Sequence, residues 1–280
     1  MTVVTIWLEP RDNALWAVAD TRISSPGPDG GITISTDSAA KLFAIPIQCN
    51  RPSSDISFKR VPHYTTSIGF AFAGDVVPAT MTVATASTFL QNLTTTGSSD
   101  PPRLSEIARM IGRLAARFSK EKLFSSNGHY GKFQSAVFGW CPVLDRFAIY
   151  ELKPHSDQAQ FDIECLEYLP KDNQQAVSFG SGAKRLNELI AHIRQNGDEF
   201  QRTSLLPKLA VEALIRENNL GDVGGNLSIG LANRFEFRLY AHVTPIVPGF
   251  PDAKMCFNGI DLFDEVGPIG HYLIAINGMA

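Results

Sequence analysis

The stretch Met1-Thr2-Val3-Val4-Thr5-Ile6-Trp7-Leu8 opens the chain with a nearly unbroken run of apolar and β-branched residues. Such residues favour strands, so we expect a strand to begin at Thr2. A residue as small as Thr2 behind Met1 normally allows that methionine to be removed. Removal would leave a hydroxyl and a free α-amine on one residue, and an amine with a pKa near ~7.7–8.0 can act as a base. The same residues also fit a simple edge strand, so the rest of the chain must decide between the two interpretations.

Further strands and helices are expected in blocks of like kind. Strands are predicted over 2–8, 14–20, 32–35, 41–45, 66–73, 133–140, 146–152, 161–167, 175–179, 226–232 and 235–242. Helices are predicted over 78–93, 104–122, 183–195 and 204–217. Pairs of helices between groups of strands do not fit an alternating parallel sheet. The pattern predicts an α+β fold, a four-layer αββα sandwich with two antiparallel sheets flanked by helices.

No repeat or break in composition divides the chain, so residues 1–280 are expected to form a single domain. Two segments do not fit the regular pattern. Residues 48–64 are polar and contain prolines, which predicts a loop insertion on the surface. Residues 243–280 form a C-terminal extension rich in Gly and Pro, with one clear apolar run over 272–276.

Composition excludes several classes of function. The chain has 25 Lys and Arg against 28 Asp and Glu, a net charge of −3, which predicts no nucleic-acid partner and no membrane surface partner. No apolar run approaches the ~18 residues of a membrane span, and the first residues do not resemble a signal peptide, so a cytoplasmic protein is expected. The four cysteines and six histidines lack ligand spacing, so we expect no metal and no cofactor.

Six short motifs follow one another in a characteristic order. They are Thr2 at a strand start, Asp20-Thr21-Arg22-Ile23-Ser24, Lys41-Leu42-Phe43-Ala44-Ile45, Ala73-Gly74-Asp75, Gly180-Ser181-Gly182 and Asp222-Val223-Gly224-Gly225. Together they resemble the proteasome β-subunit branch of the N-terminal-nucleophile hydrolases, over residues 2 to about 240. There are departures, since Val223 stands where the family has a serine and Asp222 lies nearer the glycines than the family's aspartate.

The resemblance implies a threonine-type N-terminal-nucleophile hydrolase that cleaves peptide or amide bonds. It makes Thr2 the nucleophile, with Lys41 favouring its activated form and Asp20 holding Lys41. It assigns Ser181 and Asp222 to the support of the Thr2 amine.

The resemblance also implies the binding groups of the site. It makes the backbone N–H of Gly74 the oxyanion donor, and Ser24 and Phe72 the residues that bind substrate. From the residues alone, Gly74 is equally a glycine that ends a strand. Phe72 is equally a core phenylalanine, and both readings stay open at this point.

Other functions remain compatible with the sequence. One is a small-molecule amidase or a transpeptidase on the same fold. Substrate trials with and without amine acceptors would separate these activities from a peptidase. Another is a non-catalytic proteasome-like scaffold or binding protein, which retention of Met1 would favour. A third is an unrelated αββα protein with coincidental motifs. The expected partners are a peptide or amide substrate and further copies in a homo-oligomer, although 48–64 and 243–280 put standard ring assembly in question.

Overall fold

The computed structural model describes most of the chain, and all structural statements below concern these residues. The described ranges are 2–27, 29–51, 61–95, 100–128, 130–157, 160–170, 176–197, 205–217, 221–243 and 254–279.

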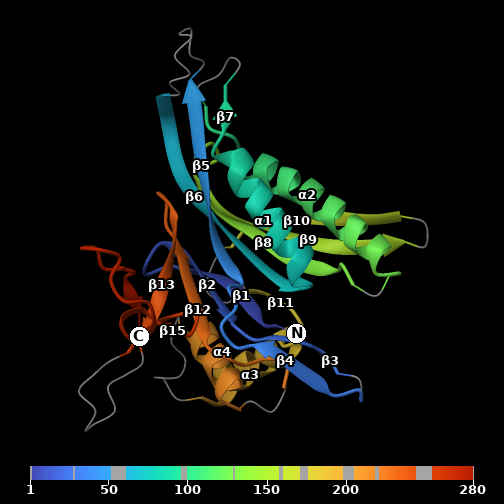
Figure 1. Cartoon of the computed structure of the whole chain (residues 1–280). Helices are drawn as coiled ribbons and strands as arrows, with labels where there is room; N and C mark the ends of the chain where they lie inside the picture. The colour runs from blue at the N-terminus through green and yellow to red at the C-terminus, as the bar shows by residue number, and fades with distance from the viewer. Residues whose placement is uncertain are drawn as a thin grey trace.

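The N-terminal strand belongs to the larger sheet, where it lies second from one edge (Figure 1). This sheet has the order β11 (Val177–Phe179), β1 (Val4–Glu9), β2 (Ala14–Asp20), β12 (Leu227–Ala232), β13 (Phe237–Val243), β14 (Met255–Phe257) and β15 (Ile260–Asp261). Strand β16 (Gly278–Met279) pairs with β13. The β1–β2 connection turns at Asn13, whose positive φ of 46° suits asparagine, so a tight hairpin sets the register of these two strands.

A second sheet has six strands. Its order is β10 (Gln160–Tyr168), β9 (Arg146–Asp157), β8 (Phe133–Cys141), β6 (Val61–Gly74), β5 (Leu42–Arg51) and β7 (Leu93–Thr94). Strands β3 (Ile23–Pro26) and β4 (Ile32–Thr36) form a separate two-stranded hairpin.

Four α-helices cover the sheets. Helices α1 (Val76–Leu90) and α2 (Leu104–Ser125) pack on the six-stranded sheet, while α3 (Ala183–Asn196) and α4 (Leu206–Glu217) pack on the larger one. Asp75 caps α1 by accepting the Val77 N–H at 3.0 Å. All four lie within a few residues of the predicted helices.

Alternation along β1 divides its side chains between two apolar clusters. Val4 and Ile6 face the six-stranded sheet, whereas Val3 and Trp7 face α3 and α4. Because both faces of the strand are buried, apolar residues lie on both of its faces, as the opening stretch of sequence indicates.

The predicted four-layer sandwich of two antiparallel sheets is wrong. The described residues are mostly β, with 43% in strands and 29% in helices, and they form three sheets. Two strand pairs are parallel, β5 with β7 and β13 with β16. The prediction failed because β7, β14, β15 and β16 have only two or three residues each, too few for a periodic signal.

The segment 48–64 is not a loop throughout. Residues 48–51 continue β5 and residues 61–64 begin β6, paired through Arg51 and Val61 with a register shift between Cys49 and Asn50. Figure 1 shows these two strands running on as a long ribbon past the helices. The central residues 52–60, like 244–253 of the C-terminal extension, lie outside the described residues. The rest of that extension includes β14, β15, β16 and a π-helical turn (Leu262–Val266).

Candidate functional site

Thr2 is held by its backbone immediately before β1. Its N–H donates to Ser181 Oγ at 3.2 Å, and its carbonyl accepts the Gly182 N–H at 3.2 Å. Gly180 has a φ of +95°, and a Cβ there would lie 2.2 Å from the Thr2 carbonyl oxygen. Only glycine allows this approach. The loop 180–182 therefore fixes the position of Thr2, whose exposed fraction is 4%.

Asp20 ends β2 and gathers four donors around one buried carboxylate. Oδ1 accepts the Val3 N–H at 2.9 Å and Lys41 Nζ at 2.8 Å. Oδ2 accepts the Gly224 N–H at 3.1 Å and the Arg22 N–H at 3.3 Å. The register of β1 with β2 sets Val4 opposite Ala19, which brings Asp20 beside Val3. The predicted partner of Lys41 thus lies in hydrogen-bonding contact with it, and the catalytic roles of both residues stay predictions.

Lys41 lies at the start of β5 and has an exposed fraction of 1%. Its carbonyl accepts the Phe72 N–H at 3.2 Å, which joins it to β6. Burial lowers the pKa of Lys41 below its ordinary value, against the opposing charge of Asp20. Burial likewise raises the pKa of Asp20, against the charge and hydrogen bond of Lys41. Lys41 is therefore easier to deprotonate than an exposed lysine.

Ser181 connects Thr2 to Asp222. Its Oγ accepts the Thr2 N–H and donates to Asp222 Oδ2 at 2.7 Å, so the three residues form one hydrogen-bonded chain. Asp222 is 7% exposed. Val223 is fully buried, and a Cβ on Gly182 would lie 2.7 Å from Val223 Cγ2. Val223, the departure noted in the sequence, thus makes an apolar contact behind the site.

Arg22 has a structural role that involves a residue the sequence reasoning missed. Its guanidinium forms a bidentate pair with Asp37, Nε to Oδ1 at 2.6 Å and Nη2 to Oδ2 at 3.2 Å. A Cβ on Gly224 would lie 2.4 Å from Arg22 Cζ. No local pattern singles out Asp37, because only the β3–β4 hairpin brings it back to Arg22.

A cavity of about 480 Å³ contains both Ser24 and Gly74 in its lining. The point where a Gly180 Cβ would lie is 3.1 Å from Ala73 Cβ and 2.2 Å from the Thr2 carbonyl oxygen. Ala73, the residue before Gly74, therefore lies near the Thr2 backbone. Ser24 and Gly74 line the same cavity, whereas Thr2, Asp20 and Lys41 are not part of its lining.

Gly74 also has a purely structural requirement. Its φ is +114°, and a Cβ there would lie 2.7 Å from the Lys132 carbonyl oxygen. Glycine is thus needed at the end of β6, where the backbone lies close to the residue before β8. The role of Gly74 as an oxyanion donor stays a prediction.

The assignment of Phe72 to substrate binding is wrong. Its side chain is 1% exposed and lies in the core between the six-stranded sheet and helices α1 and α2. It stacks on Phe43 with ring centroids 6.1 Å apart. Alternation along β6 explains the error, since Ala71 and Ala73 face the larger sheet while Phe72 faces the helices.

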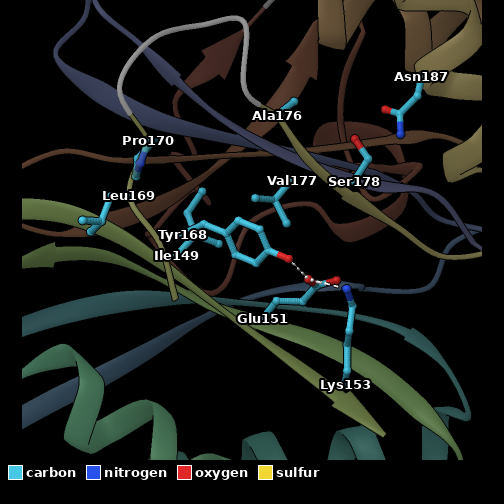
Figure 2. A pocket seen from close by; sticks show the side chains of 10 residues that line it. All are labelled: Ile149, Glu151, Lys153, Tyr168, Leu169, Pro170, Ala176, Val177, Ser178 and Asn187. Atoms are coloured by element: carbon cyan, nitrogen blue, oxygen red, sulfur yellow. Dashed lines mark hydrogen bonds and ion pairs between the residues drawn. The ribbon is translucent and has the colours of Figure 1, made fainter. Parts of the chain in front are cut away.

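A separate cavity of about 400 Å³ lies where β9 and β10 approach β11 (Figure 2). Figure 2 shows Tyr168 and Lys153 directed at the carboxylate of Glu151. Tyr168 donates to Glu151 at 2.8 Å, Lys153 pairs with it at 3.0 Å, and Gln134 also donates to it. The sequence did not indicate this cluster. Because the buried carboxylate of Glu151 has hydrogen-bond donors and a cation as partners, we assign these contacts a structural role.

The described part of the chain offers neither a metal site nor a membrane helix. Within it, no three His, Cys, Asp or Glu side chains are grouped so that they could hold a metal ion. None of its helices has the length and apolar character needed to cross a membrane.

Comparisons with known proteins find similarity in structure only. No protein-family model and no curated protein sequence matches the chain. The Anbu complex of Pseudomonas aeruginosa, described as a helical assembly, is similar with a TM-score of 0.55 and 15% identity, over 86% of each chain. Anbu (ancestral beta-subunit) of Yersinia bercovieri has a TM-score of 0.50 and 14% identity, over 82% of this chain and 81% of that one. Anbu of Hyphomicrobium sp. strain MC1 has a TM-score of 0.50 and 16% identity, over 85% and 84%.

The assignment to proteasome β-subunits of threonine-peptidase type is therefore wrong. The matching structures are Anbu proteins, and at 14–16% identity they show a distant likeness in fold alone. The six motifs misled because they are short and mostly encode backbone geometry, as at Gly180 and Gly224. Motifs of that kind accompany a shared fold.

Proposed function

We propose that the chain hydrolyses amide bonds with the Thr2 hydroxyl as nucleophile, once Met1 has been removed. The observation that supports this best is that two hydrogen-bonded networks end at adjacent residues, Thr2 and Val3. The Thr2 nitrogen is bonded to Ser181 and through it to Asp222, while the next residue, Val3, shares Asp20 with the buried Lys41.

The burial of Asp20 and Lys41 favours a functional reading of the pair. Their side chains are 0% and 1% exposed. A buried ion pair contributes little net stability, because desolvation offsets the attraction between the charges. A lysine whose pKa is lowered beside a candidate nucleophile is the arrangement that active sites use.

The proposed reaction begins with the free amine of Thr2, which takes the proton from its own hydroxyl. The alkoxide oxygen attacks the amide carbonyl, and the backbone N–H of Gly74 stabilises the oxyanion. The C–N bond breaks, the departing amine takes the proton, and an ester to Thr2 remains. Water then hydrolyses the ester and restores the hydroxyl. Lys41 stabilises the alkoxide by its charge, and Asp20 positions Lys41.

The cavity lined by Ser24 and Gly74 is the proposed binding site for the acyl side of a peptide or amide. Ser24 lines it together with residues of β3, the start of α1 and the segment 130–132. Transfer of the acyl group to an added amine would identify a transpeptidase, and turnover of small amides but not peptides would identify an amidase.

The test combines intact mass with turnover of a panel of fluorogenic amide and peptide substrates. We expect the mature protein to lack Met1, and Thr2→Ala to lower kcat by about 10³-fold or more while the fold is retained. Thr2→Ser is the matched control, because it keeps a hydroxyl and still allows removal of Met1. Retention of Met1, or turnover by Thr2→Ala equal to that of the parent, would sink the proposal.

A second candidate is a non-catalytic subunit of a larger assembly. It is favoured by the 4% exposure of Thr2 and by the helical assembly of the similar Anbu complex. This function requires association of copies but no processed N-terminus. It would be supported by an intact Met1 together with large particles in sedimentation velocity.

A further inference from the structure

A basic groove lies between helix α2 and strand β10, remote from Thr2. Its volume is about 660 Å³. Four cations of α2 line it, Arg109, Arg113, Arg117 and Lys120. The apolar part of its lining consists of Gly112, Ala116, Ile163 and Cys165.

The charge of the groove is concentrated and largely uncompensated. Residues three and four apart share one face of a helix, so the four cations form a single exposed row. Arg117 pairs with Glu121 at 3.0 Å, and among the described residues it is the one cation of the four with an ion pair. Asp162 is the other acid in the lining. The chain as a whole has a net charge of −3, so this row is a local exception.

The C-terminal extension exposes apolar and acidic side chains. Five of its large apolar side chains are strongly exposed, Phe263 (57%), Val266 (44%), Ile269 (66%), Tyr272 (81%) and Leu273 (66%). Such a concentration on a monomer marks an interaction surface. Asp264 and Glu265 stand among them and are exposed to solvent. We call residues 261–273 the acidic segment.

We propose that the acidic segment of one copy docks in the basic groove of a second copy. Figure 1 shows α2 and the C-terminal segment on opposite sides of the molecule, so the two surfaces do not meet within one chain. Contact between two different surfaces of identical chains is heterologous and leaves a free groove at one end of the assembly and a free segment at the other. The assembly therefore grows into a ring or a helical filament.

The two surfaces match in both charge and apolar character. Asp264 and Glu265 supply carboxylates to the cations of the groove, and Phe263 and Val266 supply apolar side chains to its floor. Lys254 Nζ lies 3.6 Å from Asp261 and 3.7 Å from Asp264, and Glu265 Oε1 accepts the Asp261 N–H at 3.0 Å. Among the described residues, Glu265 is therefore the acid of the three that has no ion pair. Exposed charges steer association and are screened by salt.

Charge reversal on each surface, followed by mixing, tests the docking. The groove variant is Arg109→Glu/Arg113→Glu, and the segment variant is Asp264→Lys/Glu265→Lys. By sedimentation velocity at micromolar concentration we expect the parent chain to associate, less strongly in 1 M salt. Each variant alone should associate about tenfold or more weakly. An equimolar mixture should regain association, because every contact then joins opposite charges.

Lys184→Glu is the matched control, because the Lys184 side chain is 89% exposed on α3 and belongs neither to the basic groove nor to the acidic segment. It should associate like the parent. Phe263→Ala should weaken association without altering charge. A monomeric parent at all concentrations would overturn the proposal, as would variants that associate normally or a mixture that fails to recover. None of these results depends on hydrolytic activity.

Discussion

Replacing Asp20 with asparagine is the sharpest perturbation of the site. The carboxylate accepts two donors on each oxygen, Val3 and Lys41 on Oδ1, Arg22 and Gly224 on Oδ2. Asparagine keeps the shape but offers one oxygen and one NH₂ group. In either orientation, its NH₂ group therefore faces two donors that have lost their acceptor.

The expected cost follows from the burial of the pair. Removing one partner leaves Lys41 as an uncompensated buried charge, which costs about 3–5 kcal/mol. The unsatisfied N–H groups place the result at the upper end of that range. We expect the free energy of unfolding of Asp20→Asn to fall by about 4–5 kcal/mol, a large share of the roughly 5–15 kcal/mol of an ordinary domain.

A second substitution separates the lost charge from the lost shape. Asp20→Asn/Lys41→Met removes both charges and should regain about half of the loss, since apolar replacement of a buried pair is often neutral. Urea unfolding followed by far-UV circular dichroism at pH 7 measures all three proteins, and an unchanged m-value validates the comparison. The reasoning is refuted if Asp20→Asn costs under about 1 kcal/mol, or if the double variant is no more stable than the single one.

Three further predictions concern stability and specificity. Phe72→Ala should lower the free energy of unfolding in urea by about 3–5 kcal/mol, because it leaves a cavity against Phe43 in the core. The relative kcat/KM values across a substrate panel should stay unchanged. An altered substrate preference would assign Phe72 to the binding site after all. Gly180→Ala should lower Tm and turnover together, because a Cβ would lie 2.2 Å from the Thr2 carbonyl oxygen; normal values for both would contradict the geometry. Burial lowers the pKa of Lys41 below 10.5, so the folded state binds fewer protons than the unfolded state between the two pKa values. The stability of the parent relative to Lys41→Met should therefore rise as pH rises through that window in urea titrations, and a falling difference would show that the sign is wrong.

The candidate site shows how far local patterns reach. The resemblance of short motifs groups Thr2, Asp20, Lys41, Ser181 and Asp222. The structure places them in two hydrogen-bonded groups, one that includes Thr2 and one that includes the adjacent Val3. Spacing along the chain does not predict these contacts. Thr2 and Ser181 are 179 residues apart, and they meet because β1 pairs with β11.

The errors have physical reasons as well. The resemblance assigns Phe72 to a substrate pocket, but side chains alternate between the two faces along β6. Phe72 therefore lies in the core, whereas the next residue, Ala73, faces the opposite side. Asp37 was missed because its partnership with Arg22 depends on how the β3–β4 hairpin folds back.

The sequence by itself determined the long elements, because their signals are local. The apolar, β-branched opening stretch specifies a buried strand, and the helical periodicity of 104–122 specifies α2. Tertiary structure alone decided the number of sheets, the parallel pairs and the partners of each buried polar group. Those depend on the register between strands distant in sequence, and no single stretch of residues contains that register.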